Sequence, residues 1–172
     1  SKCVSSVAPM GPSPLLRDYA AQLDCAARML KNEAGTAFPW APGFSHAPPL
    51  QWHESIAAER AYVLLWIAAE HAQSASWESR STSESLKRAA NEFQLAAGCL
   101  AHMTTLPLPA PLQDQVPCLR FLMLAQAQEC FWQKAVQDAL KDTTIAKLAQ
   151  GVSTLYADSV ALAPPAALPP DW

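Results

Sequence analysis

Glycine, basic residues and long apolar runs are all scarce in this chain of 172 residues. Five glycines leave no glycine-rich loop of the kind that cradles phosphate groups. Twelve lysines and arginines against fifteen acidic residues give a net charge of -3, which argues against non-specific nucleic-acid binding. The longest apolar run, residues 61–69, is about half of what a helix needs to span a bilayer. We therefore expect no nucleic-acid partner, no transmembrane segment and no signal peptide.

Cysteine and histidine are present, but not in patterns that bind metal or support catalysis. The five cysteines are odd in number and form no C-x-x-C pair, which favours a reducing, cytoplasmic compartment. No two of the four histidines stand four residues apart, and His53-Glu54 lacks the second histidine of a zinc-hydrolase helix. We predict no metal site, no cofactor and no enzymatic activity. A hydrolase that uses Ser45 and His46 is kept as a minor alternative, because the flanking residues only weakly resemble a nucleophile elbow.

Proline divides the chain into long segments that favour helix. The fifteen prolines fall in four clusters, and proline is poorly tolerated in helix interiors. Between the clusters, alanine and leucine are abundant, and neither strand alternation nor a hairpin signal occurs. Five helices are predicted: residues 13–32, 52–77, 83–105, 114–141 and 142–161. Residues 33–51 are predicted as a loop, and residues 164–172 as a proline-rich extended tail.

The apolar pattern within these segments predicts how the helices pack. The segment 52–77 is apolar nearly all round in its middle, so it should lie at the centre of the fold. In the next helix, Ser83 is the expected N-cap, and five apolar residues form a seam at spacings of four and three. They are Leu86, Ala90, Phe93, Ala97 and Leu100. We predict an all-α fold of long antiparallel helices, packed as a bundle or as a tetratricopeptide-like solenoid. Asp142 is the expected cap of the fifth helix.

The helical segments carry particular residues as well as a helical period. The run Leu124-Ala-Gln-Ala-Gln-Glu129 stands out, because its polar residues predict either a network between helices or a solvated face. Other groups of residues with a similarly particular composition occur from about Leu15 to Tyr156. They are Leu15-Leu16 with Tyr19, Phe38-Pro39-Trp40, Glu59-Arg60 with Val63–Leu65, Ser85–Ala90 with Phe93-Gln94, Leu122–Glu129 with Lys134-Ala135, and Ile145–Ala149. In this combination the chain resembles the BRO domain family of Alix-like, ESCRT-associated adaptors. It matches the middle portion of that domain.

The resemblance implies a partial BRO domain over residues 1–163 and a partner-binding patch on its surface. In the family, this patch binds the C-terminal amphipathic helix of a charged multivesicular body protein of ESCRT-III. Residue by residue, it falls on Phe131, Thr144 and Leu148, with Lys87 and Ser83 at its polar edge. Thr144 replaces a larger aliphatic residue of the family and Ser83 replaces an acid. The smaller anchor should weaken docking by about 1–2 kcal/mol.

Other interpretations of these residues and of the function stay open. Apolar residues at helical spacing, such as Phe131 and Leu148, more often belong to a core, and Lys87 is by default a solvated lysine. The resemblance implies a non-catalytic cytoplasmic adaptor. Its partner would recruit it to endosomal membranes for endosomal sorting and multivesicular body formation, as in vacuolar sorting. Alternatively, similar domains act as scaffolds in fungal-type ambient-pH signalling or in Rho signalling.

Overall fold

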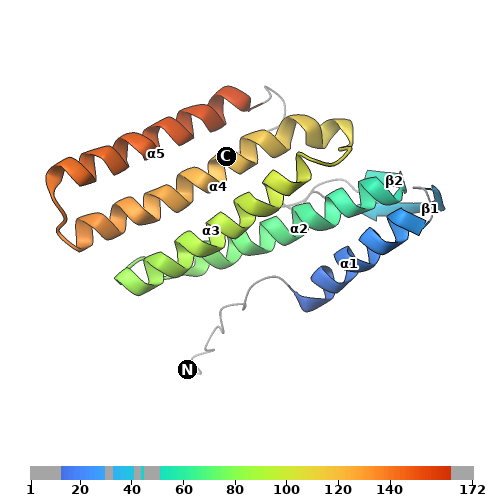
Figure 1. Ribbon diagram of the computed structural model, residues 1–172, viewed down its shortest axis with the longest axis horizontal. Helices are drawn as coiled ribbons and strands as arrows, with labels where there is room; N and C mark the ends of the chain where they lie inside the picture. The colour runs from blue at the N-terminus through green and yellow to red at the C-terminus, as the bar shows by residue number, and fades with distance from the viewer. Residues whose placement is uncertain (1–12, 30–32, 41–43, 45–50, 164–172) are drawn as a thin grey trace, which may run out of the picture.

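Four long antiparallel helices lie side by side, and a shorter helix and a hairpin cover one end (Figure 1). The computed structural model describes residues 13–29, 33–40, 44 and 51–163. The elements are α1 (Pro14–Met29), β1 (Glu33–Trp40), β2 (Gln51–Ser55), α2 (Ile56–Trp77), α3 (Ser83–Met103), α4 (Ala110–Gln137) and α5 (Asp142–Leu162). The predicted all-helical class with long packed helices is confirmed. The predicted tail at residues 164–172 lies outside the described residues.

A small antiparallel hairpin, formed by β1 and β2, was not predicted. Phe38 pairs with His53 and Trp40 with Gln51, and the register shifts between Glu33 and Phe38. Residues 33–40 were predicted as loop, and residues 52–55 as the first turn of a helix. The prediction was wrong here for two reasons. Gly35 and Pro39 interrupt the alternation of apolar and polar residues that would indicate a strand in β1, and β2 is stabilised by pairing with β1 and not by a local pattern of its own.

Helix α2 begins at Ile56 and not at residue 52, and the residues predicted to cap α3 and α5 are not their caps. Ser55 caps α2, since its Oγ accepts the Ala58 N–H at 3.0 Å. Thr82, not Ser83, caps α3, and it forms a reciprocal capping box with Ser85. Asp142 does not cap α5 but is its first residue, where a carboxylate lies at the positive end of the helix dipole.

Helix α4 begins four residues earlier than predicted, and it contains two prolines, Pro111 and Pro117, of a cluster that was predicted to form a connection. Pro109 stands at its N-cap, and Pro111 lies in the first turn, where the missing N–H has no helical partner to lose. Pro117 lies inside the helix. It removes one helical hydrogen bond, and packing of α4 between α3 and α5 compensates for this loss. The predicted first helix reached residue 32, but α1 ends at Met29 and residues 30–32 are not described.

The main core lies between α2, α3 and α4. The predicted seam of α3 is buried along its whole length, and Phe93 is only 2% exposed. Opposite this core, a second cluster joins Val63 and Ile67 of α2 to Leu23 of α1. Helix α2 is therefore buried on both sides, as its apolar pattern predicts. Helix α5 packs on α4 and contains one buried residue, Ser159.

The four cysteines in the described residues are all free thiols. Cys118 and Cys130 are buried and Cys99 is half-buried, as expected for small core residues. Cys25 is exposed, although it stands in an apolar helical segment of the kind in which free cysteine is usually a small core residue. Burial is the main cause that raises the pKa of Cys99 and Cys130, which keeps both thiols protonated at neutral pH.

A buried carboxylate joins α1 and β1 to α2. Glu59 of α2 is 2% exposed, and it accepts hydrogen bonds from the Tyr19 hydroxyl at 2.6 Å and from Trp40 Nε1. The Trp40 ring stacks on Tyr62 at 6.3 Å, and the His53 ring stacks on Tyr62 at 4.4 Å. The hairpin and α1 are thus positioned on α2 by two hydrogen bonds to Glu59 and two aromatic contacts with Tyr62.

This carboxylate makes the stability of the fold sensitive to alkaline pH. Burial, the hydrogen bond to Glu59 and the charge of Glu59 raise the pKa of Tyr19 from 10.0 to about 12. The neutral phenol stabilises the fold below about pH 10, and this contribution is lost as the pH rises towards about 12. We expect the free energy of unfolding to fall less over this range in Tyr19→Phe than in the wild type. Urea unfolding at a series of pH values measures the difference, and equal slopes for the two proteins would contradict the prediction.

Candidate partner-binding surface

Three helix ends meet at one end of the bundle and carry the five predicted partner-binding residues. Because α3, α4 and α5 run antiparallel, the start of α3, the end of α4 and the start of α5 lie together (at the left of Figure 1). Helix α4 packs against both α3 and α5 and lies between them. The candidate docking surface, called the docking surface from here on, consists of Ser83 and Lys87 of α3, Phe131 of α4, and Thr144 and Leu148 of α5.

Each of these five side chains reaches the surface to a different degree. Phe131 is 36% exposed, although it is a large hydrophobic residue. Thr144 is exposed, and Leu148, one turn later on the same face of α5, is half-buried. Ser83 is half-buried in the first turn of α3. The Lys87 side chain is 56% exposed, and its Nζ lies 3.5 Å from Glu84 on the same helix. Phe131 and Leu148 are therefore not part of the buried core.

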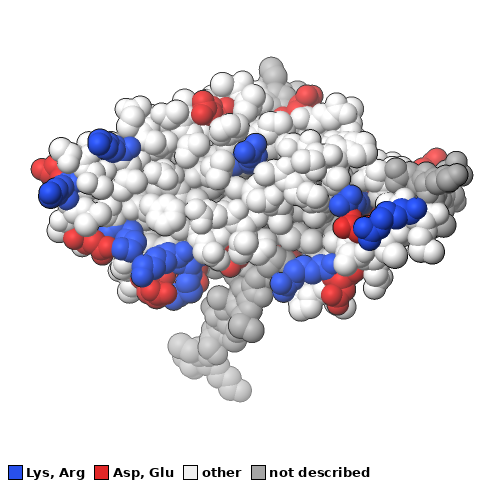
Figure 2. Space-filling model, viewed as in Figure 1, with Lys and Arg blue, Asp and Glu red and all other residues white. Residues whose placement is uncertain are grey.

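Charge is unevenly distributed on this face of the molecule. Figure 2 shows a largely uncharged area over α4 and α5, while residues of both signs gather along the lower edge and at the left end. Lys141, Asp142 and Lys147 are exposed in and before the first turns of α5. An uncharged surface bordered by charged groups, with the large hydrophobic Phe131 partly exposed on α4, suits an amphipathic partner helix.

The turn between α4 and α5 fixes where the docking surface begins on α5. Ala139 has a φ of 50°, the left-handed conformation that ends many helices. The Leu140 N–H binds the Ala135 carbonyl at 3.0 Å, and the Ala139 N–H binds the Val136 carbonyl at 3.1 Å. These two bonds form a Schellman motif with alanine where glycine is usual. The chain therefore reverses within a few residues, and α5 returns along α4.

A polar network around Glu129, two residues before Phe131, decides whether Glu129 belongs to a network between helices or to a solvated face. Glu129 of α4 accepts a hydrogen bond from the Tyr156 hydroxyl of α5 at 2.7 Å. It also pairs with Arg80 at 3.4 Å and accepts from Gln133 Nε2 at 3.0 Å. Glu129 is thus part of a network between helices. Sequence reasoning did not identify Arg80 or Tyr156, since no local pattern links residues so far apart in the chain.

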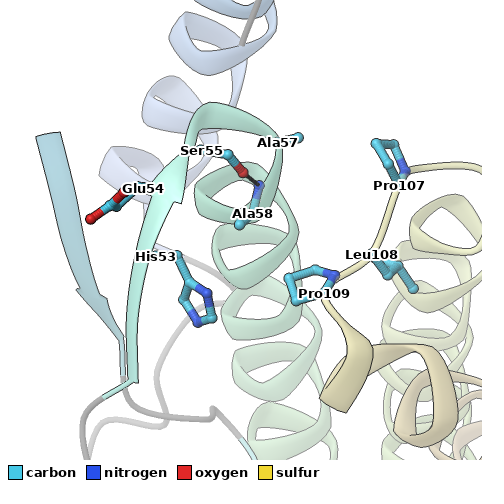
Figure 3. A pocket seen from close by; sticks show the side chains of 8 residues that line it. All are labelled: His53, Glu54, Ser55, Ala57, Ala58, Pro107, Leu108 and Pro109. Atoms are coloured by element: carbon cyan, nitrogen blue, oxygen red, sulfur yellow. Dashed lines mark hydrogen bonds between the residues drawn. The ribbon is translucent and has the colours of Figure 1, made fainter. Parts of the chain in front are cut away.

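A hollow lies at the other end of the bundle, between the start of α2 and the loop that joins α3 to α4 (Figure 3). Its volume is about 510 Å³, and it is lined by His53, Glu54, Ser55, Ala57, Ala58, Pro107, Leu108 and Pro109. Burial lowers the pKa of His53, although the charge of Glu59 opposes this effect. The Ser55 hydroxyl is used as the cap of α2, so the two side chains form no nucleophile–base pair.

The described part of the chain contains neither a metal-binding cluster nor a membrane-spanning helix. Among residues 13–29, 33–40, 44 and 51–163, no three His, Cys, Asp or Glu side chains are placed to bind a metal ion. The same residues contain no helix of sufficient length and apolar character to cross a membrane. Ser45 and His46, the basis of the minor hydrolase alternative, lie outside the described residues.

The chain belongs to the BRO1-like domain family, whose model matches residues 4–171. It is 42% identical over 165 residues to the pH-response regulator protein palA/RIM20 of Emericella nidulans. That match covers 90% of this chain and 19% of the relative. It is also 35% identical over 128 residues to the vacuolar protein-sorting protein bro-1 of Neurospora crassa, covering 72% of this chain and 12% of that protein.

A solved structure of the family has the same fold. The ALIX BRO1 domain, in a complex with CHMP4C, matches with a TM-score of 0.75 and 27% identity. The match covers 91% of this chain and 48% of that chain. This chain therefore spans about half of that structure and about a fifth of the fungal pH-response regulator. As predicted, it is a BRO-family domain that corresponds to part of longer proteins of that family.

Proposed function

We propose that this chain is the BRO-domain part of a scaffold in fungal-type ambient-pH signalling, and that it docks an ESCRT-III helix. The observation that carries the pathway is the 42% identity over 90% of the chain to a palA/RIM20 pH-response regulator. The docking role is supported by the fold shared with an ALIX BRO1 domain that forms a complex with CHMP4C. The ESCRT-III partner would bring a cytoplasmic protein to the endosomal surface.

Endosomal sorting, with multivesicular body formation, is the second candidate. It is supported by the 35% identity over 72% of the chain to a vacuolar protein-sorting protein. Both candidates use the same docking surface and differ in the pathway that it serves. A chimaera can separate them, because this chain can replace the matching segment of either relative. We expect restored pH response in the palA/RIM20 chimaera, and restored vacuolar sorting in the bro-1 chimaera alone would favour the second candidate.

The docking surface offers apolar anchors beside positive charge. An amphipathic helix can place its apolar side on Phe131 and Leu148, which are on neighbouring helices and not fully buried. Thr144 offers less apolar area than an aliphatic residue, so the contact at that point is weaker. Exposed Lys87 and Lys147 can attract acidic residues on the partner helix. We therefore propose micromolar binding in which apolar burial supplies most of the free energy.

Leu148→Asp tests this proposal by placing a charge on the anchor. We expect it to weaken binding of a labelled CHMP4C C-terminal helix peptide at least tenfold, because a buried unpaired carboxylate costs more than 1.4 kcal/mol. Fluorescence polarisation measures the dissociation constant, and circular dichroism checks that each variant is folded.

Leu155→Asp is the matched control for that experiment. Leu155 is also half-buried and lies seven residues later on the same face of α5, about 10 Å farther from the docking surface. We expect it to bind the peptide like the wild type. If both variants lost the same affinity for the peptide, the added charge would weaken binding by disturbing α5 and not by removing an anchor at Leu148. No binding by the folded wild type would reject the ESCRT-III docking role itself.

A further inference from the structure

One carboxylate joins the three chain segments that carry the docking surface. Glu129 lies on α4, two residues before Phe131, and its side chain is 27% exposed. Its oxygens bind Tyr156 on α5 at 2.7 Å and Arg80 in the turn before α3 at 3.4 Å. A single side chain therefore contacts groups on both sides of α4.

On one side of α4, the contacts of Arg80 hold the turn before α3 in position. Arg80 lies three residues before Ser83, and its guanidinium carbon is 5.9 Å from the centre of the Phe93 ring. Its backbone carbonyl accepts a hydrogen bond from Gln137 Nε2 of α4 at 3.1 Å. The turn is thus held to α4 by a side chain and by its backbone, at the end where Ser83 and Lys87 face outward.

On the other side of α4, the hydrogen bond from Tyr156 to Glu129 fixes the position of α5 along α4. Burial raises the pKa of Tyr156, and Glu129 raises it further, so the phenol stays neutral and keeps donating its proton to the carboxylate. Gly151 lies between Tyr156 and Leu148, and a Cβ atom there would be 3.4 Å from Gln128 Nε2. This distance is an ordinary van der Waals contact with the end of a glutamine side chain, so α5 lies close to α4 at this point.

We propose that Glu129 is a positioning residue for partner docking, which holds α5 and the start of α3 on α4 so that Phe131, Leu148 and Lys87 form one surface. This inference rests on the proposed docking function. It follows from the geometry because binding across three helices requires their relative positions to be set before the partner arrives. Removing a contact of Glu129 should then weaken docking although no residue that touches the partner has changed.

Tyr156→Phe tests the inference with the loss of a single hydroxyl. We expect it to weaken binding of the labelled CHMP4C helix peptide about three- to tenfold, because a charge-assisted hydrogen bond across α4 and α5 is lost. Thr154→Val is the matched control, since the Thr154 hydroxyl bonds the Gln150 carbonyl within α5 at 3.0 Å and does not reach α4. The control should bind like the wild type.

Two further readouts separate positioning from a general loss of stability. In a folded Tyr156→Phe protein, the backbone amides at the start of α5 should exchange hydrogen faster, while those of the α2–α3 core should not. Glu129→Gln should weaken docking as well. The double variant, which carries Tyr156→Phe and Glu129→Gln, should lose less binding free energy than the sum of the two single losses, since the two residues act through one contact.

The possible outcomes distinguish this inference from the proposed function. A wild type that binds, a weakened Tyr156→Phe and an unchanged Thr154→Val support the inference. If the wild type and Tyr156→Phe bind equally well, the positioning role is overturned and the docking function stands. If the folded wild type does not bind, the docking function fails, and the positioning role fails with it.

Discussion

Phe93→Ala is expected to lower the free energy of unfolding by about 3–5 kcal/mol. Phe93 is 2% exposed in the core between α2, α3 and α4, and its ring also contacts the Arg80 guanidinium. Truncation removes the apolar contacts of the ring and leaves a cavity that rigid helices cannot close. Urea unfolding followed by circular dichroism measures the change.

The neighbouring Leu95 provides the control for this substitution. Leu95 lies on the same helix and is 44% exposed, so Leu95→Ala should cost about 1 kcal/mol or less. Both changes replace a large apolar residue of α3 by alanine, and helix propensity therefore contributes similarly. A loss below about 1.5 kcal/mol for Phe93→Ala would mean that the core repacks around the missing ring.

Glu59→Ala is expected to lower the free energy of unfolding by at least about 3 kcal/mol. The buried carboxylate accepts hydrogen bonds from Tyr19 and Trp40, and each hydrogen bond to a charged group contributes roughly 1.5–3 kcal/mol. Alanine leaves both donors without this acceptor and opens a cavity between α1, β1 and α2. Urea unfolding measures the loss, and near-ultraviolet circular dichroism should report the released Trp40.

Glu84→Ala is the control for the loss of a carboxylate. The Glu84 side chain is 68% exposed, and its ion pair with Lys87 lies at the surface. We expect a change within about 0.5 kcal/mol, because exposed ion pairs contribute little. If Glu59→Ala were as mild as Glu84→Ala, the contacts of α1 and the hairpin with α2 would not depend on the carboxylate.

The helical framework could be predicted because it rests on local patterns. Proline clusters mark the connections, and the seam from Leu86 to Leu100 identifies the buried face of α3. The exact helix starts were predicted less well, since Thr82 and Ser83 are both good caps and only the contact with Ser85 distinguishes them. The hairpin could not be predicted, because its strands are stabilised by each other and by the contacts of Trp40 with Glu59 and Tyr62.

The docking surface was predicted from the family resemblance and not from the residues alone. Helical spacing places Thr144 and Leu148 on one face, but it does not say whether that face meets a core or a partner. The exposure of Phe131 became visible only in the structure. Arg80, Glu129 and Tyr156 meet across three segments, and no sequence period brings them together.

By itself, the sequence determined the class of fold, its family and the order of its helices, because helix propensity, proline and apolar period act over short distances. Only the tertiary structure decided that Phe131 and Leu148 are not fully buried, how Glu59 holds the hairpin and how Glu129 links α4 to α5 and to the turn before α3. These features depend on contacts between residues 19 to 49 positions apart, such as Trp40–Glu59 and Arg80–Glu129. Such pairs form only once the helices have packed.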